Sequence, residues 1–177
     1  MLNMIMAVRD IKKYPDPVLR HKTSRVEHID NSINQLIDDM VETMHAAPGV
    51  GLAANQVGMP FQIAVIDLGM REKSEWPHEL IVIINPEVLS TEGVVIEEEG
   101  CLSIPEYVEK VKRATKIKVR AQDRTGRLFE IEAEGLLAKA LQHEIDHLNG
   151  LLYIDRLSPL KKNIFKRRYK RLLAKES

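Results

Sequence analysis

Two histidines, His143 and His147, lie four residues apart, and Glu144 directly follows the first. Residues at this spacing share one face of a helix, so both imidazoles can bind the same metal ion. Glu144 then lies near that metal without having to coordinate it, which suits a general acid or base. The pattern predicts the metal site of a hydrolase. Asp146 is a candidate for an outer hydrogen-bond partner, with a solvent-facing helix position as the alternative.

The only cysteine of the chain, Cys101, is the candidate for a third ligand. Gly100 before it weakens a strand unless a backbone or a ligand must approach closely. A thiolate and two neutral imidazoles leave one position of a four-coordinate metal open for water, as catalytic sites require. The alternative is a buried free cysteine that packs as a small hydrophobic residue.

Residues 49–56 combine two glycines, two alanines and two amide side chains. Alone, the segment fits a loop followed by a tightly packed stretch equally well. In the functional interpretation, Gly49 and Gly51 let a substrate backbone approach, and Gln56 directs an amide donor toward a developing oxyanion.

Helices and strands must position these residues. Apolar residues of 33–44 recur at helical spacing behind a cap at Asp30 or Asn31. A second helix is expected over about 136–148, with the histidine pair near its middle. Strands are expected at 63–66, 80–84, 94–96, 117–121 and 129–133, with a hairpin turn at 123–126. These elements favour an α+β fold, mostly antiparallel sheets packed around a central metal-binding helix.

The chain of 177 residues is 44% hydrophobic and 29% charged, which is ordinary for one globular domain, expected over 1–177. One cysteine excludes an internal disulfide framework and favours a cytoplasmic setting. No apolar run reaches the roughly 20 residues that a membrane span needs. The apolar start, 1–8, lacks the preceding basic region of a signal peptide.

The C-terminal residues 157–177 are expected to form a basic helix. Ser158 is placed as its cap and Pro159 as its first residue. Nine basic residues and one acidic residue occur from Arg156 to Ser177. A polyanionic partner would explain this charge, and a solvated helix surface is the alternative. One apolar stripe is expected to contain Leu157, Leu160, Ile164, Phe165, Leu172 and Leu173.

Three segments in this order, 49–56, 99–103 and 142–147, resemble the motifs of peptide deformylases. The resemblance includes the turn-rich segment 14–20 and extends over nearly the whole chain. The basic C-terminal helix resembles the bacterial subgroup with a helical tail. The resemblance implies hydrolysis of the N-formyl group of formyl-methionyl nascent chains, with release of formate.

The resemblance also implies individual roles. Cys101, His143 and His147 would bind the metal, with Fe(II) as the native ion and Zn(II), Ni(II) or Co(II) able to replace it. Glu144 would transfer the proton, and a ribosome would be the partner of the basic helix. Gln56 and the Leu102 backbone N–H would bind the oxyanion. The substrate would be bound by Gly49, Val50, Gly51, Gly100 and Leu137.

Two other functions remain open from the residues. A zinc endopeptidase uses the same histidine–glutamate–histidine spacing, but it usually takes a third ligand downstream, and no histidine follows His147. A non-catalytic, ribosome-associated metal protein would generally close its metal site with four protein ligands.

Overall fold

The computed structural model describes residues 7–70 and 79–176, so the start of the apolar N-terminal run, residues 1–6, lies outside the described residues. Within these ranges the strands form a five-stranded antiparallel sheet of order β1-β2-β3-β6-β7 and a separate β4–β5 pair. The strands are β1 (Gly51–Ala53), β2 (Ile63–Asp67), β3 (Leu80–Glu92), β4 (Val95–Cys101), β5 (Ile104–Arg113), β6 (Lys116–Gln122) and β7 (Leu128–Glu134).

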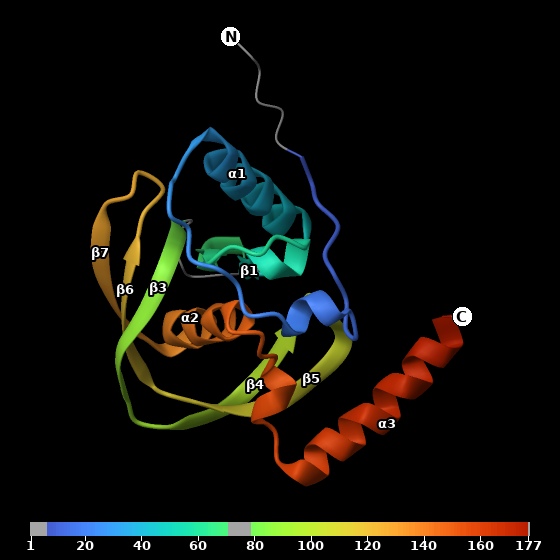
Figure 1. Cartoon of the computed structure of the whole chain (residues 1–177). Coiled ribbons are helices and arrows are strands. Elements are labelled where there is room, and N and C mark those ends of the chain that lie inside the picture. The colour runs from blue at the N-terminus through green and yellow to red at the C-terminus, as the bar shows by residue number, and fades with distance from the viewer. Residues whose placement is uncertain (1–6, 71–78, 177) are drawn as a thin grey trace.

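The helix α2 (Gly135–Leu148) lies at the centre of the molecule, between the large sheet and the β4–β5 pair (Figure 1). Its residues Ala138, Leu141 and Ile145 are buried in one cluster with Ile83 and Val119 of the sheet. The α+β fold with antiparallel sheets and a central helix is therefore confirmed.

The helix α1 (Asn31–Ala46) covers another part of the sheet with the apolar face that its periodicity predicts. Ile37 and Met40 are fully buried in a cluster with Val65 of β2. The Asp30 carboxylate accepts a hydrogen bond from the Ile33 backbone N–H over 3.0 Å, so Asp30 is the cap.

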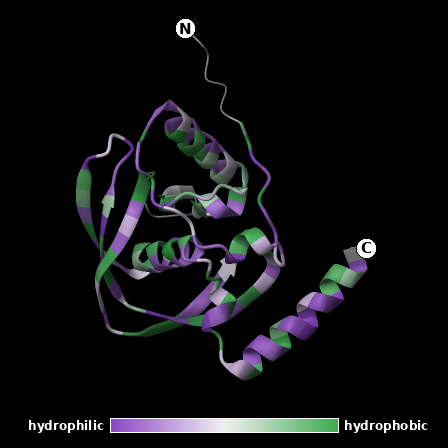
Figure 2. Ribbon diagram, viewed as in Figure 1, coloured by the Kyte–Doolittle hydropathy of each residue, from purple (hydrophilic) through white to green (hydrophobic). Residues whose placement is uncertain are grey.

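The helix α3 (Pro159–Glu176) extends from the body of the molecule and is mostly hydrophilic (Figures 1 and 2). Phe165 and Tyr169 anchor it in a cluster with Tyr107. The predicted stripe is wrong at Leu160 and Ile164, which are 69% and 49% exposed. The buried face passes through Tyr169 instead, because 165, 169 and 172–173 follow the helical repeat.

Other differences lie in the strands. The strand expected at 80–84 continues to Glu92, and the strand expected at 94–96 continues to Cys101. The strand β5 was not predicted, because its charged residues alternate irregularly and Glu106 adopts a positive φ of 63°. The expected turn at 123–126 joins β6 to β7, with the backbone N–H of Thr125 bonded to the Asp123 carboxylate.

Four short 3₁₀ helices complete the described elements: η1 (Pro17–Arg20), η2 (Ala54–Val57), η3 (Leu68–Met70) and η4 (Tyr153–Arg156). Among the described residues, every helix is too short or too polar to cross a membrane.

Candidate metal centre and active site

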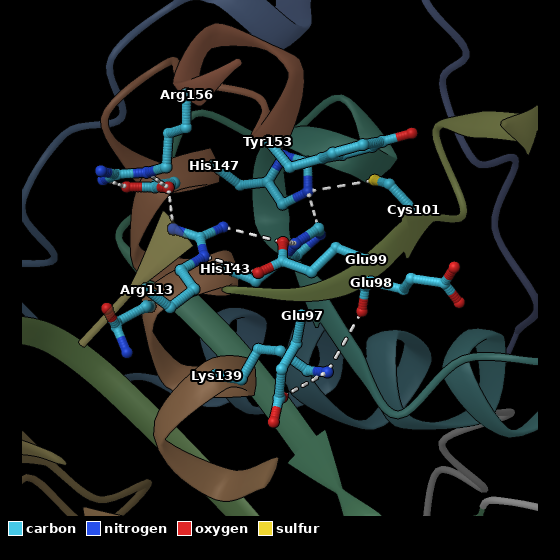
Figure 3. A network of polar contacts seen from close by, with 12 residues as sticks. Glu97, Glu98, Glu99, Cys101, Arg113, Lys139, His143, His147, Tyr153 and Arg156 are labelled. Carbon is cyan, nitrogen blue, oxygen red and sulfur yellow. Dashed lines mark hydrogen bonds and ion pairs between the residues drawn. The ribbon is translucent and has the colours of Figure 1, made fainter. Parts of the chain in front are cut away.

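Cys101, at the end of β4, lies beside His143 and His147 of α2 (Figure 3). The Cys101 Sγ is 3.3 Å from His147 Nε2, which is 3.2 Å from His143 Nε2. All three ligand atoms lie within 4.8 Å of one another. The sequence therefore identified three donors that the fold brings together from segments about 40 residues apart.

The donor set fits a divalent metal ion. Metal–nitrogen distances of about 2.0–2.1 Å and a metal–sulfur distance of about 2.3 Å, at tetrahedral angles, separate donor atoms by about 3.3–3.6 Å. The separations of 3.3 Å from Cys101 Sγ to His147 Nε2 and 3.2 Å between the two histidine Nε2 atoms are close to this range. Burial and the charge of His143 lower the pKa of His147 well below its ordinary value, so His147 is neutral and its Nε2 can bind a metal.

The carboxylate of Glu99 holds the other nitrogen of the first histidine. Its Oε2 accepts a hydrogen bond from His143 Nδ1 over 2.9 Å, so Nε2 is the nitrogen that faces the metal position. Burial lowers the pKa of His143, but hydrogen bonds to Cys101 and Glu99 outweigh burial and raise this pKa well above its ordinary value in the metal-free site. A metal at Nε2 would therefore displace a proton from His143. Burial raises the pKa of Glu99, but Arg113 and His143 outweigh burial and lower this pKa to about 2. Glu99 is therefore an anion at neutral pH.

A buried chain of charges extends from Glu99 to the surface (Figure 3). Arg113 donates to Glu99 Oε1 over 2.6 Å and to Asp146 Oδ2 over 2.6 Å, and its side chain is 1% exposed. Arg156 donates to both oxygens of Asp146 over 2.6 Å. Asp146 is therefore an outer partner of the site through Arg113, and the solvent-facing alternative is wrong.

Glu144 lies buried beside the three donors. Its Oε2 has no hydrogen-bond partner among the described residues. Burial raises the pKa of Glu144 to about 7 in the metal-free site, and a nearby cation would lower that pKa. A carboxyl group with a pKa near neutrality can both accept and donate a proton during turnover.

Gly51 permits this position of Glu144, because a Cβ at residue 51 would overlap Glu144 Oε1. Similarly, a Cβ at Gly49 would lie 2.6 Å from the Leu102 side chain. The glycines of the 49–56 segment are therefore required by close packing around the site, in addition to any approach of a substrate.

The amide of Gln56 is buried and faces the cysteine. Its Nε2 donates to Ser103 Oγ over 3.0 Å and lies 3.7 Å from Cys101 Sγ, while its Oε1 accepts from the Ala53 backbone N–H over 2.9 Å. These bonds fix the orientation of the amide. The side chain of Gln56 is therefore held beside the metal centre with its NH₂ group toward the sulfur.

A cleft of about 720 Å³ opens onto these residues. Its walls include Gly49, Val50 and Gly51 on one side, Gly100 and Leu102 on β4 and the loop that follows, and part of α2. On α2 the wall includes Leu136 and Ala140 but not the predicted Leu137. Both leucines pack against the core, and only Leu136 also reaches the cleft. Residues 136, 140 and 143 share one helical face, and residue 137 is rotated away from it.

The sequence did not single out Glu99, Arg113 or Arg156 as site residues. Glu99 is one of three consecutive acidic residues, and nothing local distinguishes it from its neighbours. Arg113 and Arg156 pair with Asp146 only because β5 and η4 pack beside α2 in the folded protein.

Comparisons with known proteins agree with this geometry. A family model described as "Polypeptide deformylase" matches residues 8–163. A peptide deformylase of Syntrophobacter fumaroxidans is 54% identical over 168 residues, which cover 95% of this chain and 97% of that protein. A peptide deformylase of Thermodesulfovibrio yellowstonii is 49% identical and covers 93% of this chain and 98% of its own length.

Solved structures show the same similarity. The crystal structure of a peptide deformylase from Legionella pneumophila has a TM-score of 0.85 and 49% identity, covering 95% of this chain and 98% of that one. A peptide deformylase from Synechococcus elongatus in complex with actinonin has a TM-score of 0.80 and 40% identity, covering 90% of this chain and 85% of that one.

Proposed function

Since this chain belongs to the peptide deformylase family, we infer that it is a metal-dependent hydrolase that removes the N-formyl group from nascent polypeptides. The products are formate and a free N-terminal amine. The observation that carries this function is the convergence of Cys101, His143 and His147 beside Glu144 in an open cleft. We further propose that residues 1–177 act as one catalytic domain.

We propose that Cys101, His143 and His147 hold one divalent ion. When bound there, such an ion acts as a Lewis acid and lowers the pKa of water toward neutrality. Fe(II) is proposed as the native metal, with Zn(II), Ni(II) or Co(II) as replacements, because sulfur and imidazole donors accept all four. Anaerobic purification followed by metal analysis distinguishes them.

The chain's own side chains account for the remaining steps. Glu144 Oε2 takes a proton from the attacking water and delivers it to the leaving amine nitrogen. The Gln56 Nε2–H and the Leu102 backbone N–H donate to the negative charge that develops on the formyl oxygen. Glu99 keeps the His143 Nε2 lone pair directed at the metal position.

The substrate is proposed to lie extended in the cleft between the 49–51 segment and β4. Main-chain hydrogen bonds to an added strand would hold it without reading its sequence. Packing within the chain does not require a glycine at residue 100, because a Cβ there would make only ordinary contacts, at 3.4 Å from Val108. The absence of a side chain at Gly100 is instead explained by the close approach of a substrate main chain.

Formate release from formyl-Met-Ala tests the function. The account predicts turnover of this peptide and no cleavage of the same peptide without the formyl group. Cleavage of the unformylated peptide would instead favour a zinc endopeptidase. No formate release from the metal-loaded wild-type protein would favour the non-catalytic, ribosome-associated alternative. Full turnover by Glu144→Ala with its metal retained would contradict the role of Glu144 in proton transfer.

We also propose that the ribosome is the partner of α3, which would place the enzyme in the cytoplasm. The side chains of Lys166, Arg167, Lys170 and Arg171 are exposed, while Phe165 and Tyr169 anchor the helix. Phosphate contacts of this kind give salt-dependent affinity for RNA.

Changing Lys166, Arg167, Lys170 and Arg171 together to glutamine tests this partner without removing the anchoring residues. Co-sedimentation with ribosomes at low salt should weaken, and formate release from a small peptide should stay unchanged. Unchanged co-sedimentation would exclude this docking surface.

A further inference from the structure

The N-terminal segment 12–14 is bonded to both chain segments that carry the proposed oxyanion donors. The backbone N–H of Lys12 donates to the Gln56 carbonyl oxygen over 2.7 Å. The backbone N–H of Tyr14 donates to the Ser103 carbonyl oxygen over 2.8 Å. The N-terminal segment therefore links the η2 helix to the loop that follows β4.

The residue between these two contacts adds a charged contact. The Lys13 ammonium donates to the Leu102 carbonyl oxygen over 2.7 Å, across 89 residues of sequence. Hydrogen bonds from an ionised donor are roughly twice as strong as neutral ones. Lys13 also lines the cleft, so this contact lies at the edge of the active site.

The Leu102 carbonyl and the Ser103 N–H belong to the same peptide group. The Ser103 N–H donates to Cys101 Sγ over 3.4 Å. A cation at the carbonyl oxygen polarises the peptide group and strengthens the bond that its N–H donates. The charge of Lys13 is thus connected to the sulfur of Cys101 through one peptide group.

We propose that Lys13 is a positioning residue that orients and polarises the Leu102–Ser103 peptide group. Fixing this peptide group fixes the adjoining Leu102 N–H, which the proposed function assigns to the oxyanion. The strengthened N–H···S bond draws electron density from the Cys101 sulfur, which makes a bound metal a stronger Lewis acid. This inference deepens the proposed function and rests on it.

The side chain of Leu102 supports the need for such a restraint. It occupies the space beside Gly49, where a Cβ would lie 2.6 Å from Leu102 Cδ1. Rotation of the Leu102–Ser103 peptide group would therefore disturb the cleft wall as well as the backbone donor. Lys13 restrains this loop from the solvent side.

The Lys13→Met variant tests the proposal by steady-state kinetics on formyl-Met-Ala. Lys13→Met keeps the aliphatic stem and removes the charge. We expect kcat to fall about three- to tenfold at unchanged KM, because oxyanion contacts form only in the transition state. This loss is well below the ~10²–10³ expected for removing a direct oxyanion donor. Lys13→Arg should retain most of the activity, and Lys22→Met, which removes an exposed charge nearby in the chain, is the matched control.

Two further measurements do not depend on turnover. In the ¹⁵N-labelled full-length protein, the Ser103 amide proton should shift upfield and exchange faster in Lys13→Met than in Lys22→Met. In the Co(II)-loaded protein, the sulfur-to-metal charge-transfer band should move to lower energy in Lys13→Met. A structural effect of Lys13 elsewhere in the protein would not change these two signals.

An unchanged Ser103 amide signal, or equal effects of Lys13→Met and Lys22→Met, would overturn the proposal. A rise in KM alone would show that Lys13 contacts the substrate instead, and would also overturn it. If the wild-type protein releases no formate, the proposed function fails, and the Ser103 signal still decides whether Lys13 acts through the peptide group.

Discussion

The Glu99→Gln substitution removes the charge at the centre of the buried ionic network. The Glu99 side chain is 3% exposed and bonds to both Arg113 and His143. Its pKa of about 2 in the folded protein compares with an ordinary value of 4.5. This difference of about 2.5 pKa units corresponds to about 3 kcal/mol of folding free energy at pH 7. This value is similar to the about 3–5 kcal/mol that is lost when one partner of a buried ion pair is removed.

The pH dependence has a defined sign. The pKa of Glu99 is lower in the folded than in the unfolded chain, so its contribution is fully present above about pH 4.5. The contribution is lost as the pH falls toward about 2, where the folded carboxylate takes up its proton. At pH 3 less than half of it remains, since most of the interval between the two pKa values has then been crossed.

Urea unfolding of the metal-free protein between pH 7 and pH 3 measures this effect. We expect Glu99→Gln to lower the free energy of unfolding by about 3 kcal/mol at pH 7 and by less than half of that at pH 3. The control is Glu98→Gln, an exposed residue of the same strand, which should change stability by less than about 0.5 kcal/mol. Equal stability of wild type and Glu99→Gln at pH 7, or a difference that does not shrink with acid, would refute the reasoning.

Two further pairs of substitutions probe the site and the C-terminal helix. Gly51→Ala should lower kcat at least tenfold with metal content retained, because its methyl group displaces the Glu144 carboxylate. Gly100→Ala should have a smaller effect, since a Cβ there makes only ordinary contacts. Formate release and metal analysis measure both variants, and normal turnover of Gly51→Ala would contradict the close packing of Gly51 against Glu144. Phe165→Ala should destabilise α3 by about 3 kcal/mol or more and speed proteolysis of the tail, while Ile164→Ala, at a 49% exposed position, should not; equal cleavage rates would argue against anchoring by Phe165.

The candidate site residues of α2 could be predicted because their spacing is local. His143, Glu144 and His147 fall on one helical turn, so a helix alone brings them together. Cys101 was identified by its residue type and by Gly100 beside it, although the sequence gives no distance to α2. The fold supplied that distance by ending β4 against the helix.

The supporting residues could not be predicted, because their partners are distant in sequence. Arg113 meets Glu99 across the β4–β5 pair, and β5 itself carries no clear alternating pattern. Lys13 contacts Leu102, 89 residues away in sequence, only because the folded N-terminal segment lies beside the loop that follows β4. Whether Leu136 or Leu137 lines the cleft depends on the rotation of α2 about its axis. An error of one residue in the expected helical face is enough to select the wrong leucine.

X-ray absorption spectroscopy of the zinc-loaded protein tests the central claim most directly. The account predicts one zinc per chain, with one sulfur at about 2.3 Å and two imidazole nitrogens at about 2.0–2.1 Å, and loss of the sulfur signal in Cys101→Ser. A spectrum without sulfur at the zinc of the wild-type protein would contradict the assignment of Cys101, His143 and His147 as one metal centre.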